Sequence, residues 1–253
     1  MITSKDNKLI KYCIQVKDKK VSRKEKVCLV ETYKVVREML QRSLVIKIIC
    51  IEPKFELFSN ICSVQIEKIT NSLADFLSDT KTTDGVFALC KIPETSNNLS
   101  DRILVLDNIQ DPSNMGAIIR SACAFGYDTI LSVNSVYPYS YKCIRSSMGH
   151  IFNVNYIETD YENLQKLKTK NNIKFVCADM RGENLDNFHS KAEKIAVIIG
   201  NEGQGVSKEI ENLSDYTISI PMKNSVESLN ASVSASIIMY YLKKWGIFYV
   251  RTQ

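Results

Sequence analysis

The 253-residue sequence has little of what marks metal sites, secretion or membrane insertion. It has only two histidines, His150 and His189, and none of its eight cysteines forms a C-x-x-C pair, so a zinc site is not expected. The first residues lack the apolar core of a signal peptide, and no apolar run is long enough to cross a bilayer. We therefore expect a cytoplasmic protein that does not associate with membranes. Its cysteines, mostly in apolar runs, are expected to be reduced core residues.

Nucleotide-phosphate motifs are missing as well. The loop Gly200–Gly205 (GNEGQG) follows an apolar strand, but it is not G-x-x-x-x-G-K-[ST] and it lacks the G-x-G-x-x-G spacing. A Walker-type ATP site and a dinucleotide site are therefore unsupported. For this segment taken alone, another phosphate loop and a plain turn remain open alternatives.

The charge is mildly basic. Lys and Arg number 33 against 28 Asp and Glu, which gives a net charge of +5. This balance is compatible with a polyanionic partner but is common among soluble proteins. The lysine-rich stretch Lys17–Lys26 has two open interpretations, a solvated surface or a set of salt-sensitive phosphate contacts.

Composition predicts two α/β segments. The polar stretch Lys91–Ser100 (KIPETSNNLS) separates two apolar regions, so we expect domains at 1–92 and 101–253 joined by a linker at 93–100. In the first, apolar periodicity predicts strands at 28–30, 44–51 and 85–91 and helices at 31–42 and 72–77. That alternation is typical of a small α/β domain.

The second segment alternates more clearly. Strands are predicted at 103–106, 129–133, 152–156, 174–178, 195–199 and 216–220. Helices are predicted at 117–125, 161–170, 207–213 and 229–245, with a short helical or loop element at 145–149. Such alternation indicates a mostly parallel sheet covered on both faces.

Three loops that follow predicted strands carry polar residues, and such loops are where parallel sheets bind ligands. In the first, residues 107–114 lead into a helix that carries Arg120; Ser113 or Asn114 as a plain helix cap is the alternative. The second is the glycine loop. The third, residues 218–238 (ISIPMKNSVESLNASVSASII), enters a helix rich in Ala and Ser, for which an N-cap serine is the alternative.

Together the three loops resemble the SpoU (TrmH-like) branch of the SPOUT methyltransferases, which are RNA ribose 2′-O-methyltransferases. The motifs N-x-G-x-x-x-R, G-N-E-G-x-G and I-P-M…S-L-N-x-S-V occur in that order between about Ile103 and Trp245. The resemblance implies an α/β fold with a deep C-terminal trefoil knot, a bound S-adenosylmethionine, an RNA partner and a homodimer, and no DNA partner.

The resemblance also implies the site residues. Those expected at the cofactor are Gly200, Ile220, Met222, Leu229 and Asn230. Those expected to be catalytic are Asn114, Arg120, Glu202 and Ser228, with Arg120 completing the site of the neighbouring subunit. Because a guanidinium is not deprotonated in proteins, our hypothesis is that Arg120 binds phosphate or ribose and stabilises oxyanion charge rather than acting as a base.

The opening I-T-S-K-D-N-K-L-I-K resembles the small α/β/α substrate-binding domain that precedes the knot in many relatives. Two departures stand out: Glu31-Thr32 replaces a common E-G pair, and His150 replaces a frequent alanine. We interpret His150 as local variation rather than as a catalytic base.

The two-domain layout favours ribosomal RNA over transfer RNA as the substrate, by analogy with relatives that modify rRNA. Two alternatives from other classes remain. One is a non-catalytic RNA-binding protein of ribosome assembly, and the other is a doubly wound nucleotide-binding enzyme. The presence of all four expected catalytic residues counts against the first, and the glycine spacing counts against the second.

Overall fold

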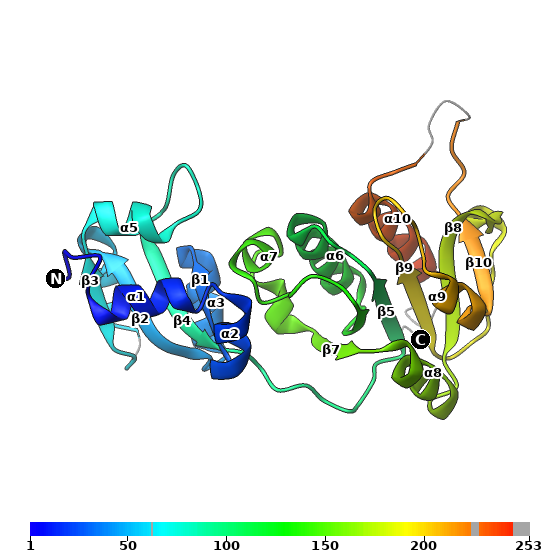
Figure 1. Cartoon of the computed structure of the whole chain (residues 1–253), viewed down its shortest axis with the longest axis horizontal. Helices are drawn as coiled ribbons and strands as arrows, with labels where there is room; N and C mark the ends of the chain where they lie inside the picture. Colours follow the sequence, from blue (N-terminus) through cyan, green and yellow to red (C-terminus); the bar gives the residue numbers. More distant parts are fainter. Residues whose placement is uncertain (62, 224–227, 245–253) are drawn as a thin grey trace, which may run out of the picture. The chain divides into compact units, whose positions relative to one another are not determined.

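The computed structural model describes residues 1–61, 63–223 and 228–244 (Figure 1). Contacts between residues divide the chain into two compact units. Unit 1 comprises residues 1–94 and 139–149, and unit 2 comprises residues 95–138 and 150–253. Residues 139–149, expected in the second segment, therefore group with the first.

Unit 1 is built on a four-stranded mixed sheet in the order β1-β4-β2-β3. Strand β4 is antiparallel to β1 and β2, whereas β2 and β3 are parallel. The elements are α1 (Lys8–Gln15), α2 (Lys19–Glu25), β1 (Val27–Glu31), α3 (Tyr33–Gln41), β2 (Val45–Ile51), η1 (Glu52–Lys54), α4 (Glu56–Ser59), β3 (Ile66–Ile69), α5 (Asn71–Leu77), β4 (Val86–Lys91) and α7 (Tyr141–Ser146).

Five elements of unit 1 confirm the sequence prediction, namely β1, α3, β2, α5 and β4. Helices α1 and α2 were missed because they lie in the lysine-rich opening. Asn7 and Asp18 cap them by accepting hydrogen bonds from backbone amides of the first turn. Strand β3 was missed because its sequence, IEKI, is short and half polar.

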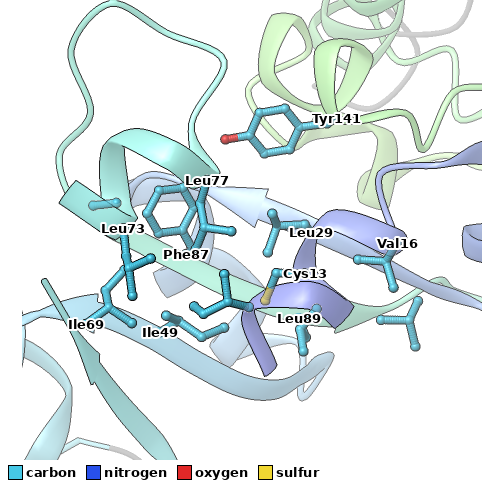
Figure 2. Packing of buried hydrophobic residues seen from close by; sticks show 13 residues of the cluster. Cys13, Val16, Leu29, Ile49, Ile69, Leu73, Leu77, Phe87, Leu89 and Tyr141 are labelled. Carbon is cyan, nitrogen blue, oxygen red and sulfur yellow. The ribbon is translucent and has the colours of Figure 1, made fainter. Parts of the chain in front are cut away.

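The two faces of this sheet are buried under different helices. Alternate strand residues such as Leu29, Ile49 and Phe87 pack with α1 and α5 in one hydrophobic cluster (Figure 2). Helix α3 packs on the same strands, and its Val36 and Met39 are fully buried. Both faces are therefore withdrawn from water, which agrees with the expected α/β/α arrangement.

Helix α7 packs against β1, the edge strand of this sheet. Tyr141 joins the hydrophobic cluster, and its hydroxyl donates a hydrogen bond to the buried carboxylate of Glu31. Glu31 also accepts hydrogen bonds from Ser78 Oγ and Thr83 Oγ1, each at 2.7 Å. Burial and the hydrogen bond to Glu31 raise the pKa of Tyr141, so the phenol remains a donor. The buried network fixes α7 over the strand edge.

Unit 2 contains a six-stranded sheet in which every neighbouring pair is parallel, in the order β10-β8-β9-β5-β6-β7. The expected parallel α/β architecture is confirmed. The elements are β5 (Arg102–Asp107), α6 (Pro112–Phe125), β6 (Thr129–Val133), η2 (His150–Asn153), β7 (Asn155–Thr159), α8 (Tyr161–Lys170), β8 (Lys174–Asn184), η3 (Leu185–Asn187), β9 (Ile195–Ile199), α9 (Lys208–Leu213), β10 (Tyr216–Ser219) and α10 (Ala231–Lys244).

Helices cover both faces of the parallel sheet. Strand residues such as Ile103 and Ile198 pack with Leu164 of α8 and Ile210 of α9. Helices α6 and α10 pack against each other, and α10 also packs against β9 (Figure 1). Burial on both faces explains why these strands are continuous apolar runs.

Several boundaries after residue 139 differ from the prediction. The strand expected at 152–156 is present but displaced, because η2 occupies residues 150–153 and β7 runs from Asn155 to Thr159. The element expected at 145–149 is the helix α7, which begins four residues earlier. Strand β8 continues to Asn184, because residues 178–182 bulge where β10 steps from Thr217 to Ile218 and pairing then resumes.

The seven cysteines among the described residues are free thiols, and all except Cys123 are buried. Burial raises the pKa of the Cys50 and Cys177 thiols to about 11. Their expected role as small core residues is confirmed. Within the described ranges, the helices are too short or too polar to span a bilayer.

Candidate active site

The carboxyl ends of the parallel strands bring the predicted loops to one edge of unit 2. Helix α6 begins there at Pro112, five residues earlier than predicted. Its N-cap is Asp111, whose carboxylate accepts hydrogen bonds from the amides of Ser113 (2.5 Å) and Asn114 (3.0 Å). The alternative of Ser113 or Asn114 as the cap is wrong. The Asn114 side chain makes other contacts instead.

Glu202 contacts the first turn of α6 from the glycine loop after β9. Its carboxylate accepts hydrogen bonds from Asn114 Nδ2 at 3.0 Å and from the amides of Gln110 (3.4 Å) and Asp111 (3.3 Å). Partial burial raises the pKa of Glu202, but these hydrogen bonds outweigh burial and the net pKa lies below its ordinary value. Glu202 is therefore an anion seated at a helix N-terminus, where negative charge is favoured.

Asn230 connects the third loop to the other two. Its Nδ2 donates to Asn114 Oδ1 at 3.0 Å, while Asn114 Nδ2 donates to Glu202. A continuous link, Asn230–Asn114–Glu202, thus joins the loops that follow β10, β5 and β9. Asn230 Oδ1 also accepts from the Ser232 amide at the start of α10. The helix expected at 229–245 therefore begins at Ala231, and Ser228 is not its cap; Trp245 lies outside the described residues.

The glycine loop is closed on itself. The backbones of Asn201 and Gly205 exchange two hydrogen bonds, at 2.8 and 3.0 Å. Asn201 Oδ1 accepts from the amides of Gly203 and Gln204, and Asn201 Nδ2 donates to the carbonyl of Asn108 at 2.8 Å. The amides that a phosphate loop would present are thus engaged within the chain, which argues against a nucleotide-phosphate site.

Gly200 is required by this closure. A Cβ at Gly200 would lie 2.3 Å from the carbonyl carbon of Gly205, closer than any side chain can approach backbone. Gly182, in the bulge of β8, is equally restricted, since its Cβ would lie 2.5 Å from the Ile218 amide nitrogen. Gly182 belongs to none of the sequence motifs, because a lone glycine within a strand gives only a weak signal.

Asp107 is a further residue of this edge to which no sequence motif assigned a role. It ends β5, is fully buried, and accepts hydrogen bonds from the Ser207 amide at 2.7 Å and from the Tyr161 hydroxyl at 3.0 Å. Ser207 lies two residues after Gly205, the end of the glycine loop, and caps α9. Asp107 therefore holds the end of that loop against β5. An acid that ends an apolar strand was the available signal.

Arg120 lies elsewhere on α6. Six residues after Asn114, it points about a third of a turn away from it around the helix. Its side chain is exposed on a face shared with Ser113, Ala117 and Ala124. Within the described ranges, Arg120 makes no hydrogen bond or ion pair with Asn114, Glu202 or Asn230. One chain thus brings together three of the expected site residues and leaves Arg120 apart.

The remaining expected residues lie on the segment after β10. Ile220 and Met222 are half-buried before residues 224–227, which are outside the described ranges, and Ser228 is exposed after them. Leu229 is half-buried beside Asn230. They share the strand-end edge with Gly200, but the hydrogen-bonded link includes only Asn230.

Comparison with known proteins decides the family. Residues 101–240 match the SpoU rRNA Methylase family, and residues 7–88 match the MRM3-like substrate binding domain. The chain belongs to the SpoU rRNA methylase family. It is accordingly a methyltransferase that acts on RNA.

One relative aligns along nearly the whole chain. The 23S rRNA (guanosine(2553)-2'-O)-methyltransferase RlmP of Bacillus subtilis (strain 168) is 26% identical over 245 residues, covering 96% of this chain and 98% of that protein. A putative TrmH family tRNA/rRNA methyltransferase of Staphylococcus aureus (strain COL) is 36% identical over 142 residues, covering 54% of this chain and 56% of that protein.

Two solved structures share the fold. A putative RNA methyltransferase of the TrmH family from Porphyromonas gingivalis has a TM-score of 0.84 at 23% identity, covering 96% of this chain and 99% of that one. The AdoMet-bound rRNA methyltransferase from Sinorhizobium meliloti has a TM-score of 0.86 at 19% identity, covering 96% of this chain and 97% of that one. At these identities the likeness concerns the fold alone.

Proposed function

We propose that this SpoU methylase transfers the methyl group of S-adenosylmethionine to a ribose 2′-hydroxyl of ribosomal RNA. The observation that carries the proposal is the Asn230–Asn114–Glu202 link at the carboxyl edge of the parallel sheet. Similarity to an rRNA 2′-O-methyltransferase over 96% of the chain supports rRNA as the substrate. In this proposal residues 1–92 recognise RNA, 93–100 form the linker and 101–253 carry out methyl transfer.

The strand-end residues fit S-adenosylmethionine. Half-buried apolar side chains at Ile220, Met222 and Leu229 lie on the segment that follows β10, as does the side-chain amide of Asn230, and Gly200 follows β9 at the same edge of the sheet. Apolar walls with a few polar groups suit a ligand with an aromatic base and a charged end. When bound, S-adenosylmethionine supplies an electrophilic methyl group.

The trefoil knot stays part of the proposal. Strand β10 pairs with β8 rather than with β9, so the connection from β9 to β10 crosses β8, and this crossing supports a knot.

Glu202 and Asn114 act by positioning in this proposal. Because hydrogen bonds lower its pKa, Glu202 is a poor proton acceptor and serves to hold Asn114. Asn114 and Ser228 orient the ribose so that the 2′-oxygen lies in line for attack, which supplies much of the rate. Arg120 binds phosphate or ribose and stabilises the charge that develops on the oxygen.

The chain is proposed to act as a homodimer. Helix α10 exposes Val233 (45%), Ile237 (37%) and Tyr240 (49%) at helical spacing, which forms an apolar stripe. Exposed stripes of this kind are typical of protein interfaces. Ser121 of α6 and Ser236 of α10 hydrogen-bond at 2.7 Å, so these two helices form one surface that also carries Arg120. Pairing of this surface with its copy would bring Arg120 to the partner's link.

We place the enzyme in the cytoplasm, where its RNA substrate would be.

The reaction is tested with labelled S-adenosylmethionine and unmodified rRNA or tRNA, followed by digestion to find the labelled atom. We expect label on one ribose of rRNA, and a loss of about 10²- to 10³-fold in Arg120→Ala. Lys170→Ala, which removes an exposed positive charge from α8 of the same unit, should transfer normally. Label on a base would overturn the ribose assignment, and label in tRNA would replace rRNA as the substrate. Cofactor binding without transfer to either RNA would favour the non-catalytic alternative.

The homodimer is tested by mixing two inactive variants, Arg120→Ala and Asn114→Ala, after reversible dissociation. If Arg120 completes the partner's site, each mixed dimer contains one complete site. Random pairing then restores about a quarter of wild-type activity. No recovery from dimers shown to be mixed would place Arg120 in its own subunit's site.

A further inference from the structure

Charge is divided unevenly between the two units. Unit 1 contains 19 Lys and Arg against 12 Asp and Glu, a net charge of +7. Unit 2 contains 14 against 16, a net charge of −2. The whole positive balance of the chain therefore resides in unit 1. A polyanion would be attracted to that unit rather than to the sheet edge that carries the Asn230–Asn114–Glu202 link.

Within unit 1, α2 is a rigid carrier of positive charge. Val21 packs against the hydrophobic cluster, and the buried Ser22 donates from Oγ to the Val27 carbonyl at 2.8 Å. Asp18 caps the helix. The opposite side exposes four basic side chains, which we call the α2 surface: Lys19, Lys20, Arg23 and Lys24.

Lys17 does not belong to the α2 surface, although it lies in the same lysine-rich stretch. Its Nζ contacts Asp79 at 2.7 Å and the Leu77 carbonyl at 2.6 Å, and lies 4.0 Å from the centre of the Tyr141 ring. Its side chain is only 16% exposed. Lys17 is therefore part of the fold. Neither interpretation of the stretch, as a solvated surface or as phosphate contacts, applies to Lys17.

Several other lysines of unit 1 are paired with acids. Lys11 contacts Asp6 at 2.8 Å, and Lys68 contacts Glu52 at 2.9 Å. Among the described residues, Lys19, Lys20 and Lys24 make no ion pair. Unpaired ammonium groups on an ordered helix keep their full attraction for an external anion.

We propose that the α2 surface binds backbone phosphates of the RNA substrate; this rests on the proposed function. Contacts of this kind give salt-sensitive affinity and do not read sequence. An anionic membrane is a poorer partner, because an interfacial helix inserts exposed apolar residues and the only apolar residue of α2, Val21, packs into the cluster. The α2 surface thus holds RNA, and the choice of nucleotide is made elsewhere.

The test compares two variants that lose equal charge. One is Lys19→Gln/Lys20→Gln/Lys24→Gln, on the α2 surface. The other is Lys166→Gln/Lys170→Gln/Lys191→Gln, which removes three exposed lysines from unit 2. Binding of wild type and of both variants to rRNA fragments is measured from 50 to 200 mM salt without S-adenosylmethionine, so that no methyl transfer occurs.

If the three lysines contact phosphates, wild-type affinity falls over this salt range about 20- to 40-fold more than that of the α2 variant. The unit 2 variant should keep the wild-type slope. Equal slopes for wild type and the α2 variant, or equal losses in both variants, would overturn the proposal. So would binding to anionic vesicles that is lost in the α2 variant while RNA binding is kept. Methyl transfer by wild type, assayed separately with S-adenosylmethionine, reports on the proposed function independently.

Discussion

Each unit contains a buried carboxylate that ends a strand and binds a tyrosine at the first position of a helix. In unit 1, Glu31 of β1 binds Tyr141 of α7; in unit 2, Asp107 of β5 binds Tyr161 of α8. The remaining partners differ. Glu31 binds the side chains of two loop residues, whereas Asp107 binds the amide of Ser207, two residues after the glycine loop.

The same pairing of a buried carboxylate with a tyrosine therefore has different roles in the two units. In unit 1 it fixes a helix over a strand edge, and the charges available to a partner lie on the surface. In unit 2 the polar groups are concentrated at one sheet edge and bonded to one another. We expect unit 2 variants to change the rate of methyl transfer and unit 1 variants to change stability or RNA affinity.

The largest effect is expected for Asn114→Ala, which removes the middle of the Asn230–Asn114–Glu202 link. Because both neighbours lose their partner, the methyl-transfer rate at saturating substrates should fall about 10²- to 10³-fold. Ser113→Ala, an exposed neighbour on the same turn, is the control and should retain wild-type activity. Unchanged single-turnover rates in Asn114→Ala would show that the link is only structural.

Next in size is Asp107→Ala. It leaves the Ser207 amide and the Tyr161 hydroxyl without their acceptor, so the free energy of unfolding should fall by about 2–4 kcal/mol. Because the glycine loop also loses its anchor, the affinity for S-adenosylmethionine should fall. Tyr161→Phe, which removes only one of the two hydrogen bonds, should lose stability but keep cofactor affinity. Denaturant titration and calorimetric binding measure the two quantities; equal cofactor affinity in both variants would contradict the anchoring role.

A smaller effect is expected for Tyr141→Phe in unit 1. The buried Glu31 carboxylate loses one donor, which should lower the free energy of unfolding by about 1.5–3 kcal/mol. The methyl-transfer rate of the folded enzyme should not change, because Tyr141 acts on the fold alone. Tyr156→Phe, in β7 of unit 2, controls for the loss of a buried phenol. A lower methyl-transfer rate of the folded Tyr141→Phe enzyme would contradict the division between the units.

The smallest effect concerns the pH dependence of Glu202. Its folded pKa lies below the ordinary value of 4.5, so its stabilisation is fully present above that value and is lost as the pH falls through the folded pKa. Wild type should therefore exceed Glu202→Gln in stability by a constant amount at neutral pH, and the difference should shrink below about pH 4.5. Glu209→Gln, an exposed acid on α9, is the control. A difference that grows on acidification would contradict the lowered pKa.

Local patterns account for much of the fold. Strands β6 and β9 and helix α8 have the predicted bounds, because each is a clean apolar run or a capped periodic segment. The start of α6 was misplaced although Asp111 and Pro112 are a recognisable cap and first residue. Helix α7 and the extension of β8 depend on distant partners, β1 and β10, which no local window contains.

The candidate site likewise has residues that the sequence predicts and contacts that only the fold reveals. The resemblance selected Asn114, Glu202 and Asn230, but their hydrogen bonds join residues 88 and 116 positions apart, so only the folded chain reveals them. Asp107 was overlooked because a buried acid is recognised by its partners, and those are 54 and 100 positions away. The separation of Lys17 from the α2 surface likewise depends on Asp79 and Tyr141.

The placement of α7 has a consequence for synthesis of the protein. A nascent chain that has passed β4 has every strand of unit 1, yet the edge of β1 is uncovered and Glu31 lacks its phenol donor until residue 141 has emerged. Strand edges left open during synthesis invite pairing with other chains. A fragment ending at the linker should therefore aggregate more readily alone than when a separate peptide of residues 139–149 is added. Ribosomes that stall between β4 and residue 141 would release the aggregation-prone form.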